Sequence, residues 1–202
     1  MSDNYTILID KLDAFIKKYY TNLLIKGALY SIALLGSFFL IFALFESVAW
    51  FSSTVRTVIF YTYIILGSLL VIRYIINPLL KLYKIGPRIS HDMAATVIGR
   101  HFHEVKDTLL NTLQLKKLSD ESPENYDLII AGINKKSEKL ISVPFKSAVS
   151  YASNKRYLFL ALPPILIISI LLVASPNILT EPGNRLINHS IKFEKPLPFK
   201  LT

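Results

Sequence analysis

The sequence of 202 residues contains no cysteine, and this absence limits the chemistry available to it. Disulfide bonds, thiolate metal sites and cysteine nucleophiles are all excluded. Charged residues are also scarce, at 18% of the chain, whereas soluble domains usually carry about 25%. A glycine-rich phosphate loop, G-x-S-x-G and H-E-x-x-H are all missing. We therefore expect no enzyme and assign no catalytic, cofactor-binding or metal-binding residue.

Three long stretches lack charge almost completely. Gly27–Phe45 contains no charged residue, and at ~1.5 Å per residue it extends about 28 Å, close to the thickness of a bilayer core. The second stretch, 57–79, is interrupted only by Arg73, whose long side chain reaches toward the interface. The third, 157–180, has no charged residue. Buried helices of soluble proteins seldom lack charge over such lengths, so the sequence predicts three transmembrane helices.

The distribution of Lys and Arg predicts the orientation. A short loop, 46–56, joins the first two spans, so 27–80 is expected to form a transmembrane helical hairpin. Residues 1–26 and 81–156 together hold 17 Lys and Arg, whereas the loop and the tail after the third span hold five. Positively charged segments tend to stay in the cytoplasm. We therefore expect that the N-terminus and residues 81–156 are cytoplasmic and that the C-terminus emerges on the far side of the membrane, which in a Gram-negative bacterium is the periplasm.

The segment 81–156 is expected to be a small helical cytoplasmic domain. Ser90 is a suitable N-cap for an amphipathic helix that runs to about Leu118. Pro123 suits the first position of another helix, which ends before Pro144. The pattern therefore predicts two or three short helices that pack on one another and on the inner leaflet.

The first 26 residues also have an amphipathic helical pattern, which predicts a helix lying on the cytoplasmic leaflet. The excess of positive charge in 81–156 has two interpretations: binding to anionic lipid or an acidic partner, or ordinary cytoplasmic bias. Nucleic acid is not expected as a partner, because no basic stripe with interleaved aromatic residues occurs. The expected partners are membrane lipids and envelope proteins, and a homo-oligomer remains open.

A small group of histidines is the only candidate for polar chemistry. His101, His103 and Glu104 form an H-x-H-E pattern, and His91 lies ten residues earlier. Two histidines two positions apart on a helix point in different directions, which disfavours chelation of one metal ion. An enzyme acting on lipid would need these residues together with Asp107. We interpret them as surface and interface residues.

The tail, 181–202, changes character. Pro182 and Gly183 predict a turn, and the final residues alternate apolar and polar side chains around Pro196 and Pro198. Prolines confine such a segment to the edge of a sheet or to a linker. The expected fold class is thus an all-α membrane protein with three transmembrane helices, followed by the start of a periplasmic β-rich segment. We expect that the full chain is longer.

Several segments resemble one family of large bacterial envelope proteins, catalogued as domain of unknown function 4175. The run His101–Leu115 carries the most specific similarity. Further matching segments are Lys11-Leu12-Asp13, Tyr19-Tyr20, Val143-Pro144-Phe145, Asn154–Leu158 and Pro196–Phe199. His103 departs from the pattern, which has Pro there in many relatives. The resemblance implies an N-terminal membrane module before a long periplasmic region, and it implies no activity.

These features together favour a structural role. We expect an inner-membrane anchor and cytoplasmic platform of a large protein reaching into the periplasm, within an envelope assembly for secretion, motility or surface biogenesis. The alternative is an accessory or regulatory subunit of a transporter or of a transmembrane signalling complex.

Overall fold

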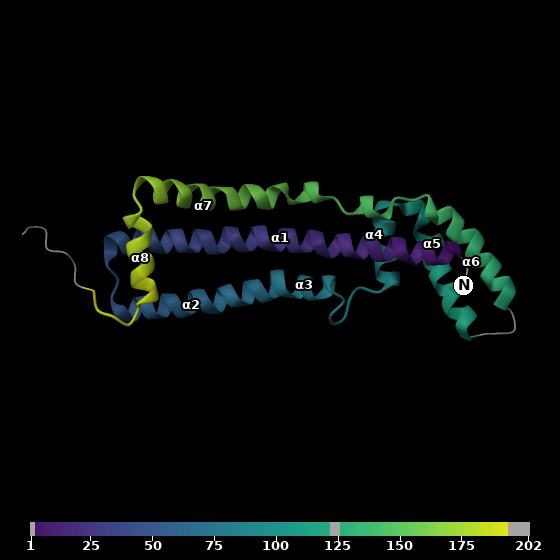
Figure 1. Cartoon of the computed structure of the whole chain (residues 1–202), viewed down its shortest axis with the longest axis horizontal. Coiled ribbons are helices and arrows are strands. Elements are labelled where there is room, and N and C mark those ends of the chain that lie inside the picture. Colours follow the sequence, from purple (N-terminus) through teal and green to yellow (C-terminus); the bar gives the residue numbers. More distant parts are fainter. Residues whose placement is uncertain (1–2, 122–125, 194–202) are drawn as a thin grey trace, which may run out of the picture. The chain divides into compact units, whose positions relative to one another are not determined.

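The computed structural model describes residues 3–121 and 126–193, and every regular element in them is a helix (Figure 1). The chain divides into two compact units. Unit 1 comprises Met1–Leu23 and Pro78–Ala152, and unit 2 comprises Leu24–Asn77 and Ser153–Thr202. The elements are α1 (Asp3–Ala49), α2 (Ser53–Val71), the π-helical turn η1 (Ile72–Ile76), α3 (Asn77–Leu82), α4 (His91–His101), α5 (His103–Glu121), α6 (Tyr126–Ile141), the 3₁₀ turns η3 (Phe145–Ala148) and η4 (Tyr151–Asn154), α7 (Lys155–Ala174) and α8 (Asn177–Ile187).

Unit 1 has its own apolar core, to which the first half of α1 contributes. Its buried side chains recur every three or four positions, so one face of the helix is apolar. This face packs in one cluster with residues of α4, α5, α6 and η3. The fully or almost fully buried members are Leu8, Leu12, Phe15, Ile16, Ala94, Ala95, Ile98, Leu109, Ile133, Leu140 and Phe145.

The course of α1 differs from the predicted interfacial helix over residues 1–26. The helix runs from Asp3 to Ala49 without a turn near residue 26. Its early apolar face packs inside unit 1, where α4, α5 and α6 supply the apolar partners. The sequence pattern predicted that this apolar face would contact a lipid leaflet. It is instead buried against α4, α5 and α6, which removes it from water.

Two lysines of α1 hold the chain that follows α6. The Nζ of Lys11 donates to the carbonyl oxygens of Ile141 and, at 2.8 Å, Val143. The Nζ of Lys18 donates to the carbonyl oxygen of Lys146 at 2.8 Å. The last carbonyl groups of a helix have no partner within it and carry partial negative charge. The Lys11 ammonium group therefore satisfies the carbonyl of Ile141, the last residue of α6, and the two lysines together attach the chain from Ile141 to Lys146 to α1.

The predicted continuous helix from Ser90 to about Leu118 is interrupted at Phe102. Phe102 has φ −117° and ψ 80°, values outside the helical region, so α4 and α5 are separate helices that pack against each other. A Cβ atom on Gly99 would lie 2.5 Å from Cγ of Lys106. The absence of a side chain at Gly99 thus allows the two helices to approach closely just beside the break.

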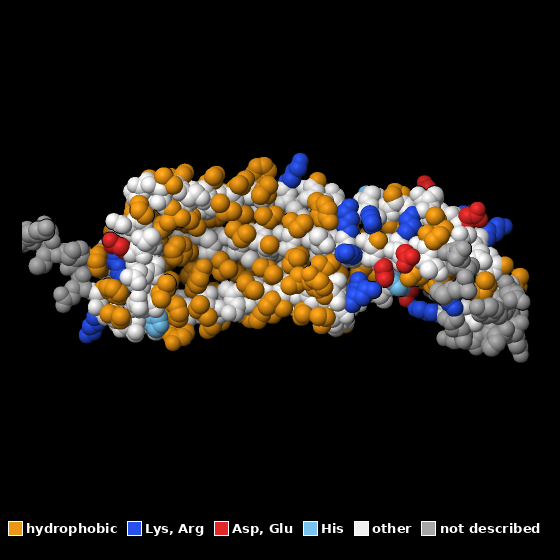
Figure 2. All heavy atoms as spheres, in the orientation of Figure 1, with side chains coloured by type: hydrophobic (Ala, Val, Ile, Leu, Met, Phe, Trp, Pro, Cys, Tyr) orange, Lys and Arg blue, Asp and Glu red, His pale blue; other side chains and the backbone are white. Residues whose placement is uncertain are grey.

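Unit 2 contains the uncharged stretches of the apolar helices. Three helices in the described part of the chain are long and apolar enough to cross a membrane: Asn4–Ala49, Ser53–Leu82 and Phe145–Ala174, with mean hydropathy of 2.3, 2.0 and 2.6 in their most apolar windows. Their large side chains remain exposed over much of α2 and α7 (Figure 2). This confirms the presence of three such helices. The third apolar run is divided at Ser175, and its last residues begin α8.

Close helix packing in unit 2 depends on glycine. A Cβ atom on Gly27 of α1 would lie 2.1 Å from the carbonyl oxygen of Tyr74, in η1. At Gly36 a Cβ atom would lie 3.3 Å from Cβ of Pro164 on α7. Small residues allow helix backbones to approach each other in apolar surroundings. The second and third apolar helices therefore both approach α1 at a glycine.

The prediction of a β-rich segment after the third span is wrong for the described residues. Residues Asn177–Ile187 form α8, and no strand occurs between residues 3 and 193 outside the undescribed 122–125. Leu179 and Leu186 are buried one above the other at helical spacing, and this burial outweighs the backbone hydrogen bond that Pro182 removes. The alternating residues 194–202 lie outside the described part of the chain.

We predict that Gly27→Ala destabilises unit 2 by about 1–3 kcal/mol, because the new methyl group overlaps the Tyr74 carbonyl oxygen, which belongs to the backbone. Gly67→Ala is the matched control, since its Cβ atom would meet only Cδ2 of Leu35 at 3.5 Å, an ordinary contact. Unfolding by denaturing detergent in mixed micelles measures both. Equal stability of the two variants would contradict this packing.

Candidate functional site

Three ionisable side chains are buried together in unit 2. Glu46 near the end of α1 is 0% exposed, Arg56 in α2 is 2% exposed, and Arg185 in α8 is 5% exposed. Charged side chains are almost never buried to this extent unless they are paired. The three residues therefore form a candidate site, which we call the ionic cluster.

The Glu46 carboxylate lies between the two guanidinium groups. Its Oε1 is 3.9 Å from Nε of Arg56 and 3.6 Å from Nη1 of Arg185. Its Oε2 accepts a hydrogen bond of 2.9 Å from the backbone N–H of Phe51, in the loop that follows α1. Nη2 of Arg185 donates to Oε2 of Glu181 at 3.1 Å, and the Glu181 side chain is more than half exposed. One buried carboxylate is thus the shared counter-ion of two buried guanidinium groups.

Aromatic rings and a carbonyl group complete the surroundings of the arginines. The guanidinium carbon of Arg185 lies 3.8 Å from the centre of the Trp50 ring, and that of Arg56 lies 4.8 Å from the centre of the Phe193 ring. Nη2 of Arg56 also donates to the carbonyl oxygen of Ile191 at 3.2 Å. Trp50 adopts φ +50°, which is uncommon for residues other than glycine. The α1–α2 loop and the chain around α8 are therefore joined through this cluster.

The sequence did not predict the ionic cluster. Glu46 and Arg56 stand at the two ends of the short loop 46–56, and Arg185 is one of the basic residues of the tail. A signal was present, because two opposite charges at the two ends of a short hairpin loop can meet when the helices pair. No comparable signal linked Arg185 to this loop, because Arg185 lies far from it along the chain.

The H-x-H-E residues lie at the break between α4 and α5. His101, His103 and Glu104 are exposed and line a cavity of about 510 Å³ together with Val143 and Pro144. The His101 ring lies edge-on to the Phe102 ring, with 4.7 Å between their centres. Within the described residues no three His, Asp or Glu side chains are placed to hold a metal ion. Asp107 is exposed on α5 and does not line this cavity.

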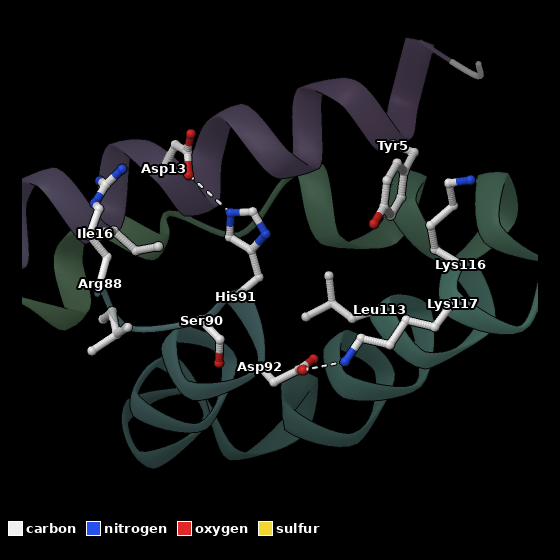
Figure 3. Close-up of a pocket in the computed structure, with 11 residues that line it drawn as sticks. Tyr5, Asp13, Ile16, Arg88, Ser90, His91, Asp92, Leu113, Lys116 and Lys117 are labelled. Atoms are coloured by element: carbon white, nitrogen blue, oxygen red, sulfur yellow. Dashed lines mark hydrogen bonds and ion pairs between the residues drawn. The ribbon is translucent and has the colours of Figure 1, made fainter. Parts of the chain in front are cut away.

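His91 lies apart from this group, in a larger cavity of about 630 Å³ (Figure 3). Its Nε2 is 3.0 Å from Oδ1 of Asp13 on α1. Nearby, Nζ of Lys117 on α5 donates to Oδ2 of Asp92 at 2.6 Å, and this hydrogen bond raises the pKa of Lys117. The cavity is lined by Tyr5, Asp13, Ile16, Arg88, Ile89, Ser90, His91, Asp92, Leu113, Lys116 and Lys117. We call it the His91 cavity.

Comparison with known proteins adds no assignment to these sites. No family model matches the chain, and no match is found among curated proteins or among solved structures. The resemblance to the envelope family stays a prediction.

We predict that Glu46→Gln destabilises the protein by about 3 kcal/mol, because the change leaves Arg56 buried without a counter-charge and leaves Arg185 paired only with the more exposed Glu181. Glu181→Gln is the matched control, and its effect should stay below about 1 kcal/mol because its carboxylate is largely in contact with solvent. Thermal unfolding followed by circular dichroism in detergent compares the two. A larger loss for the control would show that the buried carboxylate does not stabilise the cluster.

Proposed function

We propose that this protein is a membrane anchor that presents a helical platform to protein partners at a bacterial inner membrane. The observation that carries the proposal is the contrast between the two units. Unit 2 exposes large apolar side chains over most of its helices, and unit 1 is a separate helical unit with its own core. An apolar exterior suits contact with lipid tails, and a compact polar-surfaced unit suits contact with other proteins.

The distribution of charge in unit 2 supports a structural role. The stretches Gly27–Phe45 and 157–174 contain no ionisable acid or base other than tyrosine, and the second stretch, 57–79, adds only Arg73. Ion and proton pathways usually need such groups within the membrane. The ionic cluster instead lies at residues that flank the spans, where it joins the α1–α2 loop to α8. This arrangement suits an element that holds helices together better than one that conducts ions.

The envelope context of the proposal comes from charge and from the resemblance. In this proposal residues 1–26 and 81–156, which hold 17 Lys and Arg, face the cytoplasm, and the α1–α2 loop and α8 face the periplasm. The protein would anchor an envelope assembly for secretion, motility or surface biogenesis. An accessory subunit of a transporter or signalling complex is the alternative, and the identity of co-purifying proteins separates the two.

The orientation is tested with single cysteines, which are unique because the chain has none of its own. We predict that Thr54→Cys, at the exposed start of α2, reacts with a membrane-impermeant maleimide in intact spheroplasts. Lys135→Cys, on the exposed surface of α6, should react only after permeabilisation. The reverse pattern would contradict the orientation, and labelling of both residues in intact spheroplasts would contradict the membrane-spanning arrangement.

The platform role is tested by purification from native membranes in mild detergent, with quantitative mass spectrometry of the bound proteins. We expect defined envelope proteins at stoichiometric ratios to the tagged chain, and none from membranes that carry the chain untagged. Recovery of a permease or an ATPase would favour the accessory-subunit alternative. Recovery of the chain without protein partners would contradict both roles.

A further inference from the structure

Three tyrosine rings lie together at one end of the apolar helices of unit 2. The centre of the Tyr30 ring, in α1, lies 5.4 Å from that of Tyr74 in η1 and 6.5 Å from that of Tyr157 in α7. All three residues belong to unit 2. Tyrosine is enriched where a transmembrane helix leaves the hydrocarbon core, because its ring is apolar and its hydroxyl group is polar. The three rings therefore suit the level of the lipid headgroups.

Two positively charged side chains lie against the Tyr157 ring. Nζ of Lys26 is 5.0 Å from the centre of the ring, and the guanidinium carbon of Arg156 is 4.8 Å from it. Both cationic groups are also close to the Tyr157 hydroxyl group. Lys26 belongs to α1 and Arg156 to α7, so two helices bring their charges to one side chain. We call Lys26, Arg156 and the three tyrosines the tyrosine–cation cluster.

The two cations of this cluster have no counter-charge. Neither Lys26 nor Arg156 forms an ion pair with a carboxylate in the part of the chain that the structure describes. An aromatic ring attracts a cation through its quadrupole but carries no net charge, so it does not neutralise either group. The tyrosine–cation cluster thus differs from the ionic cluster, where Glu46 lies between two guanidinium groups. Its positive charge is available to an anion.

The tyrosine–cation cluster lies where charged sequence gives way to uncharged sequence. Lys26 directly precedes the uncharged stretch Gly27–Phe45, and Arg156 directly precedes the uncharged stretch 157–180. Within unit 2, α1, α2 and α7 lie alongside one another (Figure 1). In a chain that spans a membrane, the boundary between headgroups and acyl chains therefore falls at this cluster.

The cluster is accessible and adjoins an apolar surface. Arg156 is exposed, and Lys26 and Tyr157 are half-buried. Directly after Tyr157 along α7, Phe159 is 69% exposed and Leu160 is 51% exposed. An amphipathic ligand with an anionic head and apolar chains could therefore bind the cations and cover this apolar surface at the same time.

A phosphate group fits these donors. The guanidinium group presents a planar fork of donors that matches phosphate oxygens, and the ammonium group adds a compact positive charge. Because Lys26 and Arg156 both approach the Tyr157 hydroxyl group, one phosphate beside that hydroxyl can contact both cations. Basic pockets between transmembrane helices on the cytoplasmic side bind the headgroups of anionic lipids.

We propose that the tyrosine–cation cluster binds the headgroup of an anionic phospholipid of the cytoplasmic leaflet. Lys26 and Arg156 bind the phosphate oxygens, and the acyl chains lie along Phe159 and Leu160. The inference rests on the membrane-spanning arrangement and the orientation in the proposed function, and it does not depend on protein partners. Cysteine labelling tests the orientation, whereas lipid titration tests the cluster alone, so the two can fail separately.

The test titrates the full chain, in neutral detergent, with three probes observed by native mass spectrometry. The probes are dioctanoyl phosphatidylglycerol, dioctanoyl phosphatidylcholine as a zwitterionic lipid of the same chain length, and glycerol 3-phosphate, which has no acyl chains. We expect phosphatidylglycerol to bind about tenfold more tightly than either of the other probes.

Three variants locate the site. Arg156→Gln should weaken phosphatidylglycerol binding about fivefold, because one of two positive charges is lost, and Lys26→Gln should do the same. Lys155→Gln is the matched control, since it removes the same charge one residue earlier in α7 and should leave binding unchanged. At ~100° per residue, Lys155 lies on a different side of the helix from Tyr157.

Each outcome decides the inference. A preference for phosphatidylglycerol that falls in Arg156→Gln and Lys26→Gln, and persists in Lys155→Gln, supports the proposed site. Circular dichroism checks that each variant is folded, and if Arg156→Gln unfolds, Lys26→Gln alone carries the test. Equal affinity for the two lipids would overturn the proposal, as would an equal loss in Lys155→Gln. Glycerol 3-phosphate binding as tightly as phosphatidylglycerol would also overturn it, because the acyl chains would then contribute nothing.

Discussion

Packing against α1 is the interaction on which both units depend. Its first half supplies Leu8, Leu12 and Phe15 to the core of unit 1, and its second half approaches η1 at Gly27 and α7 at Gly36 in unit 2. Different interactions stabilise the packing of the two halves. The first buries large apolar side chains among polar-surfaced helices, where removal of apolar surface from water stabilises the fold. The second has an apolar exterior, so close contact at glycines supplies more of its stability.

The ionic cluster adds a constraint that apolar packing alone does not provide. Apolar helices can slide or rotate against each other at modest cost, whereas a buried carboxylate between two guanidinium groups has few acceptable positions. Leu179 of α8 packs with Leu40 and Ala43 of α1, and Arg185 in the same helix reaches Glu46. The position of α8 within unit 2 is therefore determined by apolar and ionic contacts together.

Local sequence features predicted the helical segments well and their long-range contacts poorly. Runs without charge identified three apolar helices, and Ser90 was correctly placed as the cap of α4. The end predicted for the first amphipathic helix at residue 26 is a boundary that α1 does not have. The apolar face of residues 1–26 was visible in the sequence, but its partners in α4, α5 and α6 were not. Pro182 and Gly183 suggested a turn where α8 continues. The pairs Glu46–Arg185 and Asp13–His91 join residues distant in sequence, so composition and periodicity could not reveal them.

The order in which the chain is synthesised determines when the ionic cluster can form. Glu46 and Arg56 flank one short loop, so they emerge from the ribosome almost together and can neutralise each other as soon as the first hairpin forms. Arg185 is synthesised much later, after all of unit 1's remaining helices and after α7. Until α8 is synthesised, the carboxylate has a single cationic partner and Trp50 lacks its cation. The cluster is therefore complete only after α8 has been synthesised, and a chain that stops before α8 leaves the Glu46–Arg56 pair without Arg185.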